Sequence, residues 1–329
     1  MDILGEFSLE ATRWLQENYP QLEPLFYTIT QAGRFEFYMV LITVAYWCIH
    51  KRFGRALTYL LALSYVLNSI IKHLIHNQRP FWQDPSLALV EEHSYGIPSG
   101  HAQQATVTYG LLAVFIGRAW AWIAAGVLIL LMCASRIYLG VHDIEDVVAG
   151  VLLGALILVG YALWNRYVAD RFNNRILGQR LLIAVMVPLV LAILYAAGLL
   201  LLDPPDTPPA LDSLVDAAEK QSWVDSATAF GLLTGLSIGF VMEVSRVRFK
   251  VDGSFGRRAL RYLAGIAVSF VLWQGLGAIF PDEPLALAVP LRFLRYLIVA
   301  LWVSFYAPWT FVRLGLADAR AEPEVSLKL

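Results

Sequence analysis

The chain has 329 residues, of which 58% are hydrophobic and 16% are charged, and its formal net charge is −1. Soluble domains carry about 25% charged residues, so this composition excludes a wholly water-exposed protein. The near-zero net charge also gives no reason to expect a nucleic acid partner.

Residues 1–34 are predicted to form an N-terminal segment at the membrane surface. Within 4–18, the residues Phe7, Ala11, Trp14 and Leu15 share one face at helical spacing, which is typical of an interfacial amphipathic helix. The first 30 residues are acidic and lack both a basic n-region and an apolar h-region. We therefore expect no cleavable signal peptide.

Nine apolar runs are predicted to cross the membrane, where a spanning helix takes about 20 residues. They lie at about 35–50, 56–75, 101–117, 119–138, 144–165, 180–202, 226–243, 259–280 and 291–312. An acidic, proline-rich outer loop at 203–225 separates a six-span core, 35–202, from a three-span extension, 226–313, and a tail at 314–329. The predicted fold is therefore an all-α, polytopic membrane bundle with about three helices beyond a six-helix core.

The distribution of lysine and arginine predicts the orientation of this bundle. Of the 25 such residues, 17 lie on the side opposite to the ends of the second and fourth spans. The positive-inside rule places that side in the cytoplasm. The N-terminus is then outside and the C-terminus is cytoplasmic. We expect an integral protein of a bacterial inner membrane, with its active site facing the periplasm or exterior.

Three cations lie at the outer ends of spans, where buried charge is costly and indicates a functional site. Lys72 and Arg79 close the second span, and Arg136 lies near the end of the fourth. Pro80 disfavours a helical conformation for Arg79, so this arginine is expected just past the helix end. Arginine matches phosphate oxygens in a bidentate fashion, and the three cations therefore predict a phosphate site.

The sequence Pro98-Ser99-Gly100-His101 is interpreted as a loop that enters the third span. The free N–H groups at a helix N-terminus suit an anion, and Gly100 allows the backbone to approach it closely. The residue that follows Gly100, His101, is a candidate general acid for a leaving alkoxide.

His142 and Asp146 are four residues apart, so on a continuing helix the carboxylate can orient the imidazole and stabilise its charged form. Arg136 and His142 are six residues apart, which is about 240° around a helix of 3.6 residues per turn. For both to face one phosphate the helix must break between them, and Gly140 is best able to supply the turn.

These residues form three motifs, Lys72-(x6)-Arg79-Pro80, Pro98-Ser99-Gly100-His101 and Ser135-Arg136-(x5)-His142-(x3)-Asp146. They resemble the signature of the type 2 phosphatidic acid phosphatase (PAP2) superfamily, in its integral membrane lipid phosphatase branch. The resemblance covers about residues 35–165. It implies a lipid phosphate or diphosphate substrate, and a reaction through a phosphohistidine that needs neither metal nor cofactor. His142 would be the nucleophile, Asp146 its orienting partner and His101 the acid, while Lys72, Arg79, Ser99, Gly100 and Arg136 would hold the phosphate.

Asp143 departs from the pattern of relatives, where the position after the nucleophile is often aromatic or small. With Glu145 it makes the mouth of the site more acidic. Two metal sites are conceivable from the sequence, but neither is favoured. His73 and His76 have the spacing of ligands but lack a further Cys or His pair, and Asp143, Glu145 and Asp146 point to different faces.

Two other functions stay open on the sequence. The first is a glucose-6-phosphatase-like hydrolase of soluble sugar phosphates, which the three extra spans suit by analogy. The second is a transporter of lipids or anions that kept the site for recognition only. The pairing of His142 with Asp146 argues against the transporter, because binding alone needs no carboxylate behind a histidine. Oligomeric state is not predicted.

Overall fold

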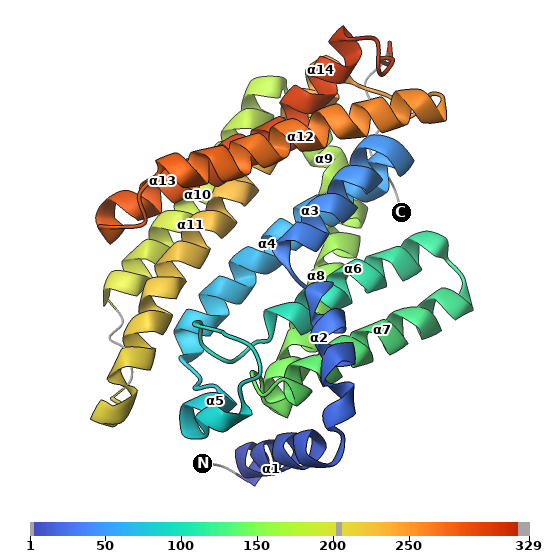
Figure 1. The fold of residues 1–329 in the computed structure, drawn as a ribbon. Helices are drawn as coiled ribbons and strands as arrows, with labels where there is room; N and C mark the ends of the chain where they lie inside the picture. Colours follow the sequence, from blue (N-terminus) through green and yellow to red (C-terminus); the bar gives the residue numbers. More distant parts are fainter. Residues whose placement is uncertain (1–2, 202–205, 322–329) are drawn as a thin grey trace. The chain divides into compact units, whose positions relative to one another are not determined.

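Helices make up most of the computed structural model, which describes residues 3–201 and 206–321 (Figure 1). Among the described residues the β-structure is limited to an isolated antiparallel bridge between Phe249 and Ala319. The all-α prediction is therefore confirmed for the described residues.

The helices before the third motif are α1 (Ile3–Asn18), α2 (Glu23–Gln31), α3 (Phe35–Val44), α4 (Lys51–Ile75), α5 (Pro80–Gln83), α6 (Gly100–Ile116) and α7 (Ala119–Tyr138). Those after it are α8 (Ile144–Tyr167), α9 (Ala169–Asn173), α10 (Leu177–Leu201), α11 (Asp212–Met242), α12 (Phe255–Ile279), α13 (Leu285–Leu301) and α14 (Ala307–Arg313). Short π-helical turns follow α3, α11 and α13.

Seven helical segments of the described chain are long and apolar enough to cross a membrane. An eighth is obtained if Pro20–Gln31 and Phe35–Ile49, which are bent by 49° at a short break, count as one span. All nine predicted spans correspond to helices of the described chain, and seven or eight of them meet this criterion of length and composition. The predicted span at 101–117 corresponds to α6, which has only 17 residues and carries buried polar side chains such as Gln103 and Thr106.

Two compact units divide the chain, and each is built from separate stretches of sequence. Unit 1 consists of Met1–Tyr38, Leu67–Val159 and Leu199–Trp223, and unit 2 of Met39–Val66, Gly160–Gly198 and Val224–Leu329. All eight predicted site residues lie in unit 1. Residues 1–2 and 202–205 of unit 1, and 322–329 of unit 2 with the end of the predicted tail, lie outside the described residues.

Small residues allow α6 and α7 to pack side by side in unit 1 (Figure 1). Ala113, Ala121 and Ala125 form a buried cluster between them. The turn that joins the helices has Gly117 at φ 67°, the left-handed conformation that commonly ends a helix at glycine. This hairpin brings the start of α6 and the end of α7 to the same end of the unit.

The outer loop predicted at 203–225 is helical from Asp212 onward, where α11 begins. Pro208 and Pro209 stand just before the helix, a position that proline tolerates because the first N–H groups of a helix are unpaired anyway. Within the first turns of α11, Val215 and Ala218 pack on Trp82 and Tyr95. The stretch was predicted to be a loop because of its acidic residues, although apolar residues recur at every third or fourth position on one side of its first helical turns, where they are at least partly buried.

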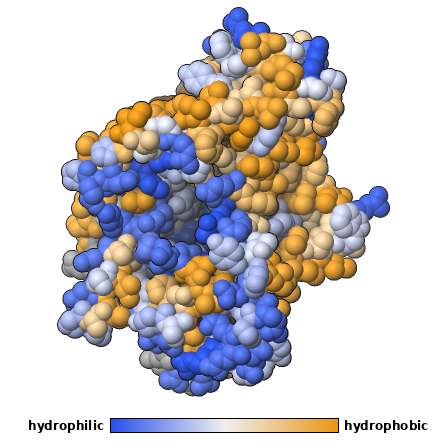
Figure 2. Space-filling model, in the orientation of Figure 1, coloured by the Kyte–Doolittle hydropathy of each residue, from blue (hydrophilic) through white to orange (hydrophobic). Residues whose placement is uncertain are grey.

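Exposed apolar side chains cover the long helices of both units, and Figure 2 shows this hydrophobic surface on one face of the molecule. Leu152 and Leu156 of α8 are 59% and 65% exposed, and Val271 of α12 is 67% exposed. Apolar surface of this extent marks an interaction with a partner or membrane, and with the length of the helices it fits lipid contact.

Helix α1 turns a polar face toward the protein, while Phe7 and Trp14 are 59% and 54% exposed. Ser8 and Thr12 are buried, and their hydroxyls bond to the N–H of Ile144 and the carbonyl of Ile137. The outward position of Phe7 and Trp14 suits the predicted membrane-surface role. The inward contacts support the turn between α7 and α8.

Candidate active site

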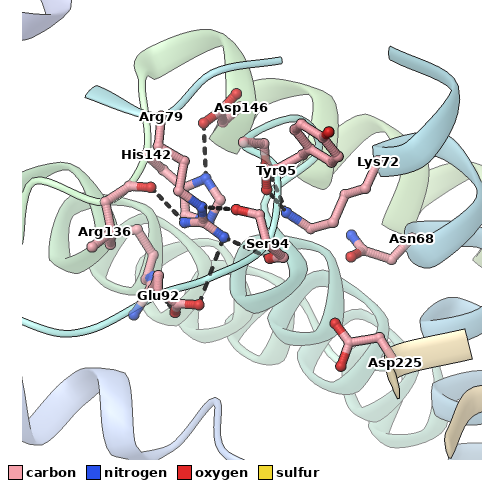
Figure 3. A network of polar contacts seen from close by, with 12 residues as sticks. Asn68, Lys72, Arg79, Glu92, Ser94, Tyr95, Arg136, His142, Asp146 and Asp225 are labelled. Atoms are coloured by element: carbon pink, nitrogen blue, oxygen red, sulfur yellow. Dashed lines mark hydrogen bonds and ion pairs between the residues drawn. The ribbon is translucent and has the colours of Figure 1, made fainter. Parts of the chain in front are cut away.

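Three segments of unit 1 meet around the predicted residues: the chain from the end of α4 to α5, the loop before α6, and the turn between α7 and α8 (Figure 3). Most of the side chains involved are buried, including Lys72, Arg79, Arg136, His142 and Asp146. A buried cluster of three cations and two acid–base groups is costly unless its members are paired, so their contacts define the site.

His142 Nδ1 lies 2.8 Å from Oδ2 of Asp146. This contact favours the tautomer in which Nδ1 carries the proton, and the lone pair of Nε2 then faces the guanidinium of Arg79. Burial and the neighbouring charges of Arg79, Lys72 and Arg136 lower the pKa of His142 well below its usual value. The imidazole is therefore neutral near pH 7.

The turn between α7 and α8 breaks the helix where the sequence predicted it. α7 ends at Tyr138, Gly140 has φ 70°, and α8 begins only at Ile144. A Cβ added at Gly140 would lie 2.0 Å from the carbonyl oxygen of Leu87. His142 thus stands before α8 rather than on a continuing helix, and the turn itself brings it to Asp146.

Asp146 is held by further contacts in the first turn of α8. Its Oδ2 accepts the N–H of Asp143 at 3.2 Å, and its Oδ1 accepts from Asn77 at 3.3 Å. Asp143 is buried, with 9% exposure, so it does not line the mouth of the site as the sequence suggested. These contacts orient the carboxylate toward His142.

Arg79 is the contact point between the loop before α6 and the α7–α8 turn. The backbone of Arg79 is extended between α4 and α5, as predicted from the proline that follows it. Its guanidinium donates to the backbone carbonyl and the hydroxyl of Ser94 and to the carbonyl of Val141, and Nη1 lies 3.3 Å from Nε2 of His142. The guanidinium is therefore beside the nitrogen that would attack.

Lys72 points from the last turn of α4 into the same loop (Figure 3). Its ammonium donates to the carbonyl oxygens of Tyr95 and Gly96, the latter at 2.9 Å. Those carbonyls hold the ammonium in place. Its positive charge lowers the pKa of both His142 and Glu92.

Arg136 pairs with Glu92, a residue that the sequence did not single out. Nη2 of Arg136 donates to Oε1 of Glu92, and Nη1 donates to the hydroxyl of Thr30 at 2.6 Å. The second oxygen of Glu92 lies 3.6 Å from Nη2 of Arg79. One carboxylate thus bridges two of the three predicted phosphate ligands.

The start of α6 is hydrogen-bonded to the first turn of α8, beside His142. The N–H of Ser99 donates to the carbonyl of Asp146 at 2.8 Å, which joins the second motif to the third. The buried hydroxyl of Ser99 has no hydrogen-bond partner among the described residues. A Cβ at Gly100 would meet Oδ1 of Asn68 at an ordinary 3.5 Å, so the protein itself does not demand glycine there.

His101 occupies the first turn of α6 and packs closely on the short link between α2 and α3. A Cβ added at Gly33 would lie 2.1 Å from its Cδ2. The charges of Arg136 and Glu92 act on it, and it acts in turn on His142. Its imidazole is therefore part of the charged cluster, although no hydrogen bond joins it to His142 among the described residues.

Sequence reasoning missed several groups that hold the predicted residues in place: Thr30, Asn68, Asn77, Glu92 and Ser94. Most lie in irregular segments that carry no periodic signal. The one hint was the concentration of polar residues between the second and third spans.

The chain matches two family models. One is described as "PAP2 superfamily" and covers residues 53–170, and the other as "PAP2 superfamily phosphatase, transmembrane extension" and covers 227–319. The first contains all three motifs. The second covers the C-terminal spans, in which the sequence offered no motif.

Several characterised proteins are similar to the chain. Phosphatidylglycerophosphatase B of Bacillus subtilis is 32% identical over 151 residues, which cover 42% of the chain and 72% of that protein. Glucose-6-phosphatase catalytic subunit 1 of Canis lupus familiaris is 27% identical over 47% of the chain and 52% of its own length. Human sphingosine-1-phosphate phosphatase 2 is 30% identical over 43% of the chain and 37% of its length.

The chain thus spans about half the length of the glucose-6-phosphatases that it matches. Among solved structures, a transmembrane PAP2 type phosphatidylglycerolphosphate phosphatase from Bacillus subtilis is 27% identical, with a TM-score of 0.44 over 50% of the chain and 85% of that structure.

Proposed function

Since the chain belongs to the PAP2 superfamily of phosphatases, we propose that it hydrolyses a lipid phosphate or diphosphate through a phosphohistidine formed on His142. The observation that carries the proposal is the contact of His142 with Asp146 at 2.8 Å, beside the guanidinium of Arg79. A histidine held by a carboxylate on one nitrogen presents the other to an electrophile, and the adjacent cation suits a phosphoryl group.

In the first step Nε2 of His142 attacks phosphorus, and the bond to the ester oxygen breaks. Arg79, Arg136 and Lys72 stabilise the charge on the phosphoryl oxygens, with the Ser99 hydroxyl and the N–H groups at the start of α6 as further donors. Asp146 stabilises the imidazole as it becomes positively charged. His101 gives a proton to the leaving alkoxide.

In the second step water attacks the phosphohistidine, and His101 takes a proton from that water. The P–N bond breaks, inorganic phosphate leaves, and His142 returns to its neutral form. The chain's own residues supply every proton transfer in this sequence, so the proposed reaction needs no metal.

We place the active site on the non-cytoplasmic side, with the headgroup in the cationic cluster and the lipid tail among the helices. The support is the excess of lysine and arginine at the opposite ends of the spans. A lipid substrate is supported by the match to phosphatidylglycerophosphatase B, which the chain covers to 72%.

A soluble sugar phosphate is the second candidate, favoured by the similarity to glucose-6-phosphatases over 184 residues. Phosphate release by the purified protein, measured in chelator-treated buffer, separates the two. The substrates are phosphatidylglycerophosphate, phosphatidate, a prenyl diphosphate, a sphingoid-base phosphate and glucose 6-phosphate. We expect turnover of a lipid, and preference for the sugar phosphate would overturn the lipid assignment.

The histidine mechanism is tested by His142→Ala, which should abolish turnover in a folded protein, with the exposed His93→Ala as the matched control. Asp146→Asn should slow the reaction less, because only the orienting group is lost. Brief incubation with radiolabelled substrate should trap an acid-labile, base-stable phosphoprotein in the wild type. Retained phosphate release by His142→Ala would rule out this nucleophile.

A further inference from the structure

A second cluster of ionisable side chains lies in unit 1, beside the site already described. His73 and His76 stand at the end of α4, and Glu219 belongs to α11, nearly 150 residues further along the chain. One ligand atom from each lies within 4.8 Å of the other two. The two histidines had the spacing of metal ligands in the sequence, and the fold adds the carboxylate that they lacked.

We propose that His73, His76 and Glu219 bind a divalent transition metal ion, with Zn²⁺ as the best fit. Two imidazoles and one carboxylate form a donor set that zinc uses, with the fourth position open to water. This site is separate from the reacting groups, and it stands whether or not the proposed phosphatase activity is correct.

Oε1 of Glu219 is close to both imidazoles without a short hydrogen bond to either, and its separation from His76 matches that of two ligands on one ion. Oε1 of Glu219 lies 3.5 Å from Nε2 of His76 and 3.8 Å from Nδ1 of His73. Ligands at about 2.0–2.2 Å from a tetrahedral zinc ion are separated by about 3.3–3.6 Å. Nε2 of His76 is buried and makes no hydrogen bond among the described residues.

The backbone at His76 is a second, independent observation. His76 follows the last turn of α4 with φ 52°, a left-handed conformation that residues other than glycine seldom adopt. Such strained conformations cluster at functional sites. At His76 the left-handed backbone accompanies an edge-on approach of the two imidazoles, with ring centroids 4.5 Å apart.

Tyr95 supplies the outer support that a metal-binding carboxylate usually has. Its hydroxyl donates to Oε1 of Glu219 at 2.6 Å, and its own carbonyl accepts from Lys72. An ion on Glu219 would therefore fasten the start of α11 to the end of α4 and hold the loop that orients Lys72. His76 and Glu219 are 11% and 22% exposed at the side chain, which leaves a path for the ion to enter.

The test uses tag-free, full-length protein in detergent after removal of metal by a chelator. Titration with Co²⁺ should give the strong visible absorption of a tetrahedral site at about one equivalent, and Zn²⁺ should displace it. Added Zn²⁺ should also raise the melting temperature. His76→Ala and Glu219→Gln should each weaken Co²⁺ binding more than tenfold, and Tyr95→Phe roughly tenfold.

Matched controls come from the loop before α6, where His93 and Glu91 are exposed and lie outside the cluster. His93→Ala and Glu91→Gln should bind Co²⁺ as the wild type does. Metal-free melting curves check that each variant is folded. The proposal is overturned if the wild type shows no tetrahedral Co²⁺ spectrum at millimolar metal, or if folded His76→Ala and Glu219→Gln retain it.

Discussion

Glu92 is ion-paired with Arg136 inside the cationic cluster, and its side chain is only 25% exposed. Burial raises the pKa of this carboxyl, but the charges of Arg79 and Arg136 outweigh burial and hold the pKa well below its usual range. The carboxylate is therefore ionised near neutral pH. Under the proposed function, a phosphate that enters the site must compete with it for the two guanidinium groups.

Replacement of Glu92 by glutamine should therefore strengthen the binding of anions. We expect the inhibition constant of inorganic phosphate to fall by roughly tenfold, which corresponds to about 1.4 kcal/mol. Product release should become slower for the same reason. Steady-state inhibition by phosphate measures the effect.

The matched control is Glu91→Gln, which removes the same charge from the exposed neighbouring residue. It should leave phosphate inhibition within about twofold of the wild type, because exposed charges are screened by salt. Equal effects of the two substitutions would show that Glu92 acts only through net charge.

The pH dependence of kcat/KM follows from the lowered pKa of His142. Attack requires neutral imidazole, which persists below the ordinary histidine pKa of about 6.5 because burial and three cations disfavour its protonation. The acid limb that reports this histidine should therefore lie below pH 6.5. A rate profile at saturating and limiting substrate measures it, and loss of activity centred at or above pH 6.5 would contradict the assignment.

Arg79→Lys tests whether geometry or charge matters at this position. Lysine keeps the positive charge but cannot make the forked contacts with Ser94 and Val141 while it stays beside His142. We expect kcat/KM to fall by at least a hundredfold. The control is Arg13→Lys, at an exposed ion pair with Asp84, which should change kcat/KM by less than twofold.

The eight predicted site residues come from local patterns, and unit 1 brings them into one region. Three features of this region can be predicted from neighbouring residues in the chain. They are the extended residue before Pro80, the turn at Gly140, and the four-residue spacing of His142 and Asp146. The sequence therefore predicted that His142 would face Asp146, and also where the helix between Arg136 and His142 would break.

The supporting groups depend on contacts between distant residues. Glu92 reaches Arg136 across 44 positions, and Tyr95 reaches Glu219 across 124. Nothing in the local pattern of either segment indicates these pairs. The same holds for α11, where an acidic exposed face concealed the apolar side that packs on Trp82 and Tyr95.

Gly140→Ala should disrupt the turn on which His142 stands. The residue has φ 70°, and its Cβ would lie 2.0 Å from a backbone oxygen that cannot move independently. We expect a loss of roughly 2–4 kcal/mol in the free energy of unfolding, together with a large loss of activity. The control is Gly160→Ala inside α8, where nothing lies within 4 Å of the added Cβ, and there stability should rise or stay level. Thermal unfolding in detergent compares the two.

Ser8→Ala tests whether α1 supports the catalytic turn from outside. The Ser8 hydroxyl accepts the N–H of Ile144 at 2.8 Å, at the first residue of α8 and two residues after His142. Loss of the hydroxyl leaves this N–H without its acceptor, which costs about 1–3 kcal/mol when the group is buried. We expect a lower melting temperature and a several-fold fall in kcat, because the position of His142 relative to Asp146 depends on how α8 begins. Thr28→Val is the matched control, since it removes an exposed hydroxyl that bonds only within α2. If Ser8→Ala behaved like Thr28→Val, α1 would be a membrane-surface helix without influence on the site.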